Sequence, residues 1–142
     1  HNMWPTAFRY VPALDPAGFF LCLLSLTTTP LVRTPSRAAW LFLTAGALLT
    51  PTELHAALGP ESIWPVLQYN PLMWKPAKQV PTPLLWLAAD GDTLIPEAAQ
   101  RRSAAHYGAD YLVAEGGHDL MLERSSQQTA RRIHDWLVAR GM

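Results

Sequence analysis

The sequence predicts an α/β protein, in which a small parallel sheet is flanked by helices and preceded by a mostly helical segment. The run at 83–89 is apolar throughout, which is typical of a strand that a parallel sheet buries on both faces. A second strand pattern follows at 110–114, and a helical pattern lies between the two at 96–106. The order strand, helix, strand predicts parallel pairing, because parallel neighbours need a long crossover connection.

The first part of the chain is expected to form short helices. Residues 1–83 hold twelve of the thirteen prolines but only eight charged residues, against fourteen charged residues in 84–142. Each proline removes a backbone donor and disfavours helix at the residue before it, so long helices are excluded. A short strand is expected to end at Tyr10-Val11. The expected helices lie at 15–27, 36–49, 51–58 and 61–70.

Each strand of the second part is followed by a helix. The helix over 96–106 begins with a proline, has Glu97 in its first turn and stops at Gly108, all of which favour those helix ends. The last helix, over 126–139, carries an apolar stripe made by Ala130, Ile133, Trp136 and Leu137. Such a stripe predicts a helix that covers one face of the sheet.

Composition excludes several classes of protein. Eleven basic and eleven acidic residues leave no net charge, so no basic face for nucleic acid or anionic lipid is expected. The longest apolar runs, 17–26 and 38–49, are shorter than the ~20 residues that cross a bilayer, and no basic segment of the signal-peptide kind precedes the first of them. The single cysteine, Cys22, excludes an internal disulfide and a Cys-rich metal site. We therefore expect a cytoplasmic protein without a transmembrane segment.

Two polar side chains follow the predicted strands. Asp92 comes just after the first strand, and His118 follows the second behind Gly116-Gly117, which allow a tight turn. The carboxyl ends of neighbouring parallel strands lie about 4.8 Å apart, so we expect the two side chains to meet. In such a pair the carboxylate fixes the imidazole tautomer, and the other ring nitrogen serves as a general base. The alternative is that Asp90 or Asp92 caps the following helix and His118 is an ordinary loop residue.

Four motifs of the second part add a resemblance to this reading. They are Asp92-Thr-Leu-Ile-Pro96, Tyr107-Gly-Ala109, Gly117-His-Asp-Leu-Met-Leu-Glu123 and Ile133-His-Asp-Trp-Leu137. Over about 60 residues they resemble the C-terminal half of an α/β-hydrolase, and residues 12–18 resemble the segment that leaves the core of that fold. The resemblance implies a partial α/β-hydrolase fold. Its parts would be 1–18 as entry strand and loop of the core sheet, 19–82 as helical cap, and 83–142 as the C-terminal part of the core.

The resemblance also implies roles for single residues. Asp92 would be the acid of a catalytic triad and His118 its base, whereas Asp90 does not stand four residues before the proline. Glu123 and Asp119 match positions that buttress the histidine loop. In the implied cap, four aromatic residues are candidates for lining an acyl pocket or a lipid-facing surface, and the alternative is that they only pack the cap together. These residues are Trp40, Phe42, Trp64 and Trp74.

The nucleophile of that family does not occur in this sequence. It belongs on a Gly-x-Ser-x-Gly elbow upstream of the acid and the histidine. None of the six serines is flanked in this way, and Cys22 lies in an apolar run, where a buried hydrophobe is expected. Three explanations fit: a fragment of a longer chain, a truncated gene product, or a subunit completed by a second copy or partner. An edge left open on so small a sheet predicts tight association with another chain.

The expected function is hydrolysis of a small ester or acyl substrate by a serine hydrolase similar to carboxylesterases, lipases and lysophospholipases. General-base chemistry of this kind needs no cofactor, and no metal site is expected. Two alternatives stay open. One is a non-catalytic, truncated or domain-swapped subunit that works by association. The other is a dehalogenase or epoxide hydrolase of the same fold, with an aspartate nucleophile upstream.

Overall fold

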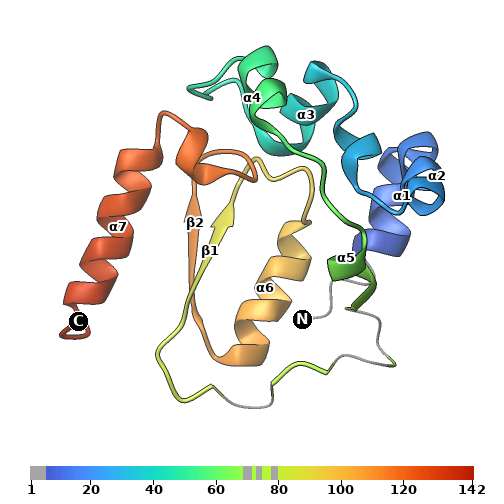
Figure 1. Ribbon diagram of the computed structural model, residues 1–142. Coiled ribbons are helices and arrows are strands. Elements are labelled where there is room, and N and C mark those ends of the chain that lie inside the picture. The colour runs from blue at the N-terminus through green and yellow to red at the C-terminus, as the bar shows by residue number, and fades with distance from the viewer. Residues whose placement is uncertain (1–5, 69–71, 73–74, 78–79) are drawn as a thin grey trace.

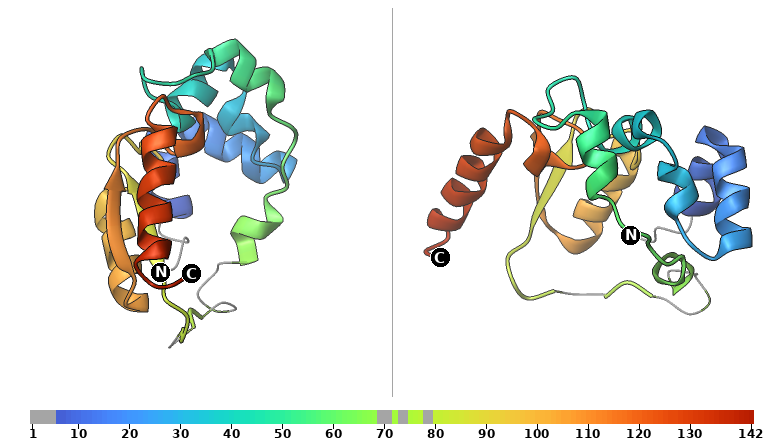
Figure 2. Two further views of the ribbon diagram at one scale, coloured as in Figure 1. Left: turned by 90° about the vertical axis from the view of Figure 1, so that its left-hand side faces the viewer. Right: turned by 45° about the horizontal axis from the view of Figure 1, so that its top comes forward.

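A computed structural model describes residues 6–68, 72, 75–77 and 80–142 (Figure 1). Over these residues the protein is a mixed α/β structure with one small parallel sheet. The sheet, α6 (Glu97–Tyr107) and α7 (Ser126–Val138) form one side of the molecule, and the helices of the first part gather on the other, as the two views in Figure 2 show.

The sheet consists of β1 (Leu85–Ala89) and β2 (Asp110–Ala114). They pair in parallel, with Leu85 opposite Asp110 at one end and Ala89 opposite Ala114 at the other. The crossover between them contains α6 (Glu97–Tyr107), so the predicted order and direction of the strands are confirmed. In Figure 1 the strands lie between α6 and α7 (Ser126–Val138).

Helix α6 ends where its sequence predicts. Gly108 adopts a left-handed conformation, with φ of 62°, and its N–H donates to the carbonyl oxygens of Ala104 and Ala105. A residue without Cβ adopts this conformation without steric cost, which makes glycine the usual stop. Ala104 is buried together with Ala88 of β1 and Ala114 of β2, and these small side chains allow close packing of the helix on the sheet.

Helices α3 (Pro35–Phe42) and α4 (Pro51–Ala57) lie beyond the carboxyl ends of the strands, and the other helices of the first part lie to one side, past α6 (Figure 1). Several have proline in the first turn, where no backbone donor is needed. In chain order the elements are η1 (Thr6–Tyr10), α1 (Val11–Leu14), α2 (Pro16–Ser25), η2 (Thr29–Val32), α3 (Pro35–Phe42), α4 (Pro51–Ala57) and α5 (Trp64–Gln68).

The strand expected at Tyr10-Val11 is wrong. Tyr10 ends η1, a π-helical turn, and Val11 begins α1. A strand needs a neighbour for its backbone hydrogen bonds, and the described residues 6–18 have none beside them in the sheet. A helix satisfies its own backbone groups, and the Phe8 ring packs edge to face on the Phe19 ring of α2, with centroids 5.6 Å apart.

Helix α3 is much shorter than the predicted 36–49, because it ends at Phe42. The residues after it are held by the distant segment that follows the histidine. Ala47 forms an antiparallel bridge with Glu123, and the Leu48 N–H donates to the Leu122 carbonyl oxygen at 2.7 Å. These long-range bonds replace the helical ones. The helix predicted at 61–70 is observed as α5, Trp64–Gln68, and positions 69 and 70 lie outside the described residues. Elsewhere the predicted helices and strands are confirmed, with ends that differ by two residues or fewer.

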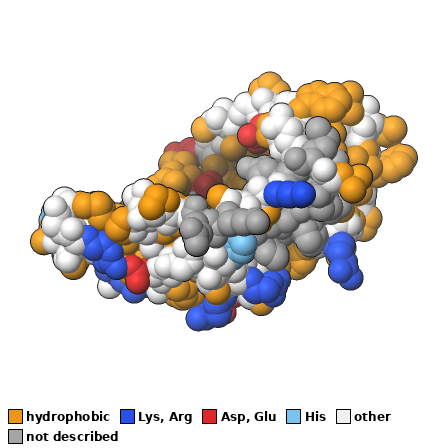
Figure 3. All heavy atoms as spheres, turned by 90° about the horizontal axis from the view of Figure 1, so that it is seen from below, with side chains coloured by type: hydrophobic (Ala, Val, Ile, Leu, Met, Phe, Trp, Pro, Cys, Tyr) orange, Lys and Arg blue, Asp and Glu red, His pale blue; other side chains and the backbone are white. Residues whose placement is uncertain are grey.

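Helix α2 leaves much of its apolar surface uncovered. Its inner face buries Gly18 and Cys22, whereas Phe20 and Leu24 are 60% and 67% exposed. Seen from below, hydrophobic side chains form much of the surface on the side where α1 and α2 lie (Figure 3). None of the helices in the described part of the chain is long and apolar enough to span a membrane.

Candidate active site at the carboxyl ends of the strands

Asp92 lies in the turn after β1, and four donors hold its carboxylate. Oδ1 accepts hydrogen bonds from the N–H groups of Leu94 at 2.8 Å and Ile95 at 2.9 Å. Oδ2 accepts from Gln100 Nε2 at 3.2 Å and from His118 Nδ1 at 3.0 Å. The side chain is only 6% exposed, and this set of bonds leaves it in one orientation.

His118 lies in the loop after β2 and meets Asp92 as the sequence predicts. Because the carboxylate accepts, Nδ1 carries the proton and Nε2 is the ring nitrogen that remains for chemistry. The ring also packs on Phe42, with centroids 5.9 Å apart and planes tilted by 40°. Its side chain is 28% exposed, so the imidazole is held at a wall but can still be reached.

The contact between Asp92 and His118 favours the charged form of each side chain, so the pKa of His118 is raised and that of Asp92 is lowered. The hydrogen bond to Asp92 raises the pKa of His118 above its usual value, although burial opposes this. Burial by itself would raise the pKa of Asp92, but the hydrogen bonds from His118 and the backbone outweigh it and lower that pKa. An imidazolium formed at His118 is therefore stabilised, as a general base requires.

Asp90, the other candidate acid, has a different partner. Its Oδ1 accepts from the Gly116 N–H at 3.0 Å, which ties the turn after β1 to the loop after β2. Asp92 therefore makes the contact with the imidazole. The capping alternative also describes part of its role, because Oδ1 of Asp92 binds backbone N–H groups just before α6.

The loop that carries His118 is packed tightly against the end of α3. A Cβ on Gly117 would lie 2.6 Å from the Phe42 carbonyl oxygen, so only glycine fits. The Asp119 N–H donates to that same oxygen at 3.1 Å. Thr93 fastens the neighbouring turn in the same way, donating from Oγ1 to the Trp40 carbonyl oxygen at 2.7 Å.

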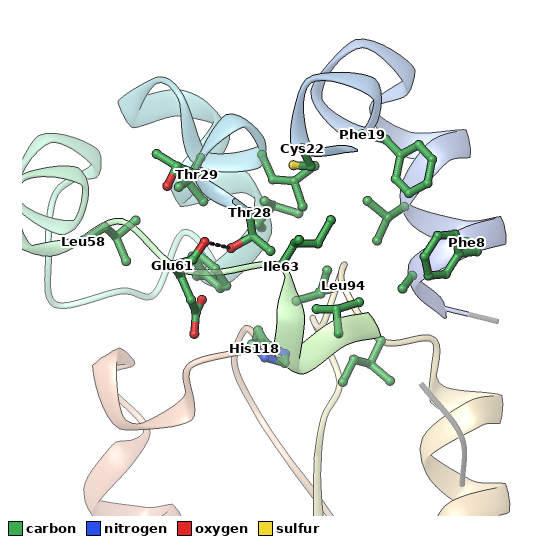
Figure 4. Close-up of a pocket in the computed structure, with 18 of the residues that line it drawn as sticks. Phe8, Phe19, Cys22, Thr28, Thr29, Leu58, Glu61, Ile63, Leu94 and His118 are labelled. Carbon is green, nitrogen blue, oxygen red and sulfur yellow. Dashed lines mark hydrogen bonds between the residues drawn. The ribbon is translucent and has the colours of Figure 1, made fainter. Parts of the chain in front are cut away.

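An apolar cavity of about 430 Å³ opens beside His118 (Figure 4). Helices of the first part form one side of it, and the loops that carry Leu94 and His118 form the other. Apolar side chains dominate its wall, among them Phe8, Phe19, Leu41, Phe42, Ile63 and Leu94. A cavity of this character accepts an apolar group, and its wall carries the His118 imidazole together with one carboxylic side chain, Glu61.

The predicted aromatic residues are only partly brought together. Phe42 lines the cavity, but Trp40 and Trp64 are not among the described residues that do. Both are exposed, by 41% and 58%, and Trp40 instead stacks under the Arg37 guanidinium at 5.1 Å. Trp74 lies outside the described residues. Other lining residues such as Ile63 were missed because an apolar residue in a helical pattern has the same signal whether it faces a core or a cavity.

The hydroxyl and thiol groups of the cavity have other partners. Thr28 Oγ1 donates to the Glu61 carbonyl oxygen at 3.4 Å, and Thr29 Oγ1 lies 2.8 Å from Thr27 Oγ1. Burial raises the pKa of the Cys22 thiol, which keeps it protonated. In the described part of the chain, no three His, Cys, Asp or Glu side chains are grouped so that they could hold a metal ion.

No family model, curated protein or solved structure matches this chain. The site is therefore described by its geometry alone: a carboxylate and an imidazole are in contact at the carboxyl ends of the two strands of a small parallel sheet.

Proposed function

We propose that this chain supplies the acid and the general base of a serine hydrolase of the α/β-hydrolase type that acts on carboxylic esters. The observation that carries the proposal is the 3.0 Å contact between His118 Nδ1 and Asp92 Oδ2, with the imidazole at the wall of an apolar cavity. A carboxylate and a histidine in this relationship are the two members of a triad that move and stabilise a proton.

The proposed reaction moves one proton at a time through Nε2 of His118. A serine hydroxyl gives its proton to Nε2 as its oxygen attacks the ester carbonyl carbon, and Asp92 stabilises the resulting imidazolium. His118 then returns the proton to the leaving alcohol when the ester bond breaks, and an acyl-enzyme remains. Water repeats the two steps, which releases the acid and restores the serine.

The nucleophile would come from another segment or chain that extends the sheet at β1. Asp110 N–H donates to Leu84 and Asp90 N–H donates to Ala114, so the parallel ladder leaves the N–H and C=O groups of Leu85 and Leu87 on the open side of β1. At the outer edge of β2 one backbone group already has a partner, because Arg132 of α7 donates to the Val113 carbonyl oxygen at 2.6 Å.

The cavity supports an ester with an apolar acyl group as the substrate. Its volume is about 430 Å³, and each methylene transferred from water into such a site contributes about 0.8 kcal/mol. Hydrolysis should therefore become more efficient as the acyl chain of the ester lengthens, until the cavity is filled.

The proposal is tested on the complex that the chain forms with the polypeptide that completes its sheet. Hydrolysis of p-nitrophenyl esters is compared for the wild type and for His118→Ala and Asp92→Asn, with labelling by a fluorophosphonate probe. Both variants should lose hydrolysis by at least about a hundredfold, as loss of a general base predicts. Unchanged turnover in His118→Ala would reject the role. Hydrolysis without fluorophosphonate labelling would favour an aspartate nucleophile, as in a dehalogenase or epoxide hydrolase.

A second function is favoured by the open side of β1 itself. Since the hydrogen bond described for the His118 ring goes to Asp92 and not to a hydroxyl or thiol, a non-catalytic subunit that works by association is also consistent with the fold. A complex that forms stably but hydrolyses no ester, with or without His118, would support this second function.

A further inference from the structure

Glu123 is the most completely buried large side chain that the structure describes, being 1% exposed. Its carboxylate has no basic partner among the described ion pairs. It accepts three hydrogen bonds instead. Oε1 accepts from the N–H groups of Thr44 at 2.8 Å and Gly117 at 3.0 Å, and Oε2 accepts from Thr44 Oγ1 at 2.8 Å.

The three donors come from two loops that are far apart in the sequence. Thr44 belongs to the cap loop, residues 43–50, which follows α3. Gly117 belongs to the histidine loop, residues 115–119, and directly precedes His118. One carboxylate thus joins a loop of the first part of the chain to the backbone of the residue beside the imidazole. Thr44 and Glu123 are 79 positions apart.

The resemblance implies that Glu123 buttresses the histidine loop. From its contacts with Thr44 we propose in addition that Glu123 latches the cap loop to the histidine loop, so that the cap loop orients His118 through it. The inference goes beyond the proposed function, although its meaning for catalysis rests on it. Displacement of the cap loop would remove the donors of Thr44 from the carboxylate and free the Gly117 backbone. The cap loop would in this way affect the orientation of His118 indirectly, because Thr44 contacts Glu123 and not the imidazole.

The chemistry of the donors supports a latch rather than plain packing. A buried carboxylate without donors is costly, and hydrogen bonds to a charged acceptor are about twice as strong as neutral ones. Both Glu123 oxygens are used, and Thr44 Oγ1 also accepts from the Gly46 N–H at 3.0 Å, which fixes the direction in which it donates. An apolar side chain of the same size would fill the space but would leave the Thr44 and Gly117 N–H groups unpaired.

Four variants of the 142-residue chain separate positioning from general stability. Thr44→Val removes the hydroxyl and keeps the shape. Glu123→Ala removes the latch, and Glu123→Gln preserves an oxygen for the two N–H donors and an amide that can donate to Thr44 Oγ1. The matched control is Thr50→Val, because Thr50 Oγ1 also donates to a glutamate, Glu53, at 2.7 Å, within the capping box of α4.

The measurements are the NMR titration of the His118 imidazole and the hydrogen exchange of the Gly117 amide. Thr44→Val and Glu123→Ala should lower the pKa of His118 towards the ordinary value of about 6.5. They should also speed exchange at Gly117 at least about tenfold, or about 1.4 kcal/mol. Glu123→Gln should restore both readouts, and Thr50→Val should leave them unchanged.

Wild-type readouts in both Thr44→Val and Glu123→Ala would overturn the latch, as would an equal effect of Thr50→Val. If Glu123→Ala does not fold, Thr44→Val decides the question, since it retains the carboxylate and the shape of the loop. Neither readout depends on a nucleophile. A failure of the latch is therefore distinguishable from a failure of the proposed hydrolysis.

Discussion

Nδ1 of His118 lies 3.0 Å from Oδ2 of Asp92, although 26 positions separate the two residues in the chain. Parallel pairing of β1 and β2 brings the turns that follow them to the same edge of the sheet. The contact therefore depends on the register of the sheet as much as on the two side chains. It assigns Nε2 as the nitrogen available to take up a proton.

Replacing Asp92 should change the titration of His118. In Asp92→Asn the carboxylate that raises the pKa of His118 is absent, so this pKa should fall towards or below about 6.5. Asp90→Asn is the matched control, because the Asp90 carboxylate contacts the Gly116 N–H and lies on the same turn. NMR titration of the imidazole measures both, and an equal shift in the two variants would contradict the assignment of Asp92 as the partner.

The same pair should make stability depend on pH. The folded-state pKa of His118 is raised by Asp92, so its contribution to the free energy of unfolding is present below about pH 6.5 and is lost as pH rises through the folded-state value. The pKa of Asp92 is lowered, because hydrogen bonds outweigh its burial. Its contribution is present above about pH 3.9 and is lost as pH falls through the folded-state value.

Urea denaturation of the wild type and His118→Ala at two pH values checks this sign. The difference in unfolding free energy between the two proteins should be larger at about pH 6 than at about pH 9, because only the lower pH retains the protonated imidazole beside Asp92. A difference that is equal at both pH values, or larger at the higher one, would contradict the proposed linkage.

Gly117→Ala should destabilise the protein, because its methyl group would lie 2.6 Å from the Phe42 carbonyl oxygen. Overpacking of this kind costs about 1–3 kcal/mol. Gly59→Ala is the control, since a methyl group there would meet nothing within 4 Å. Thermal unfolding of the two variants should show a lower midpoint for Gly117→Ala alone. A Gly117→Ala protein as stable as Gly59→Ala would mean that the histidine loop is not packed so closely on α3.

Association through the open side of β1 should respond to proline. Leu87→Pro removes an N–H that faces away from β2, so it blocks an added strand and leaves the β1–β2 ladder intact. Leu87→Ala is the control for loss of the side chain. Light scattering should give the wild type and Leu87→Ala a mass well above the 15.8 kDa of one chain, and Leu87→Pro a lower mass. A wild type that is monomeric at all concentrations would contradict association between copies.

The sheet and the Asp92–His118 contact could be predicted because their signals are local. An apolar run marks each strand, the crossover implies parallel pairing, and carboxyl ends of parallel strands share an edge. The contact between Asp92 and His118 follows from the strand pairing and does not depend on how the helices pack. Register alone brings Ala89 opposite Ala114, and Asp92 and His118 follow within four residues of these positions.

The remaining features depend on partners that no sequence window contains. Helix α3 stops early because Glu123 binds Thr44 and bridges to Ala47, and an apolar periodic pattern carries no sign of such a distant competitor. Tyr10 and Val11 have the residue types of a strand, but the described chain offers them no neighbouring strand. The sequence also could not predict which aromatic rings face the cavity, because only tertiary packing decides whether a ring lines the cavity or is exposed to solvent.

The donors of Asp92 have a consequence for how the site is assembled. Leu94, Ile95 and Gln100 lie two, three and eight positions after it, so three of its four donors come from the short segment that contains the carboxylate, and only His118 comes from farther away. His118, by contrast, depends on Gly117, Glu123 and a threonine 79 positions before that glutamate. The orientation of Asp92 therefore depends mainly on its own neighbourhood and that of His118 on distant segments, so sequence changes remote from the site should affect the histidine first.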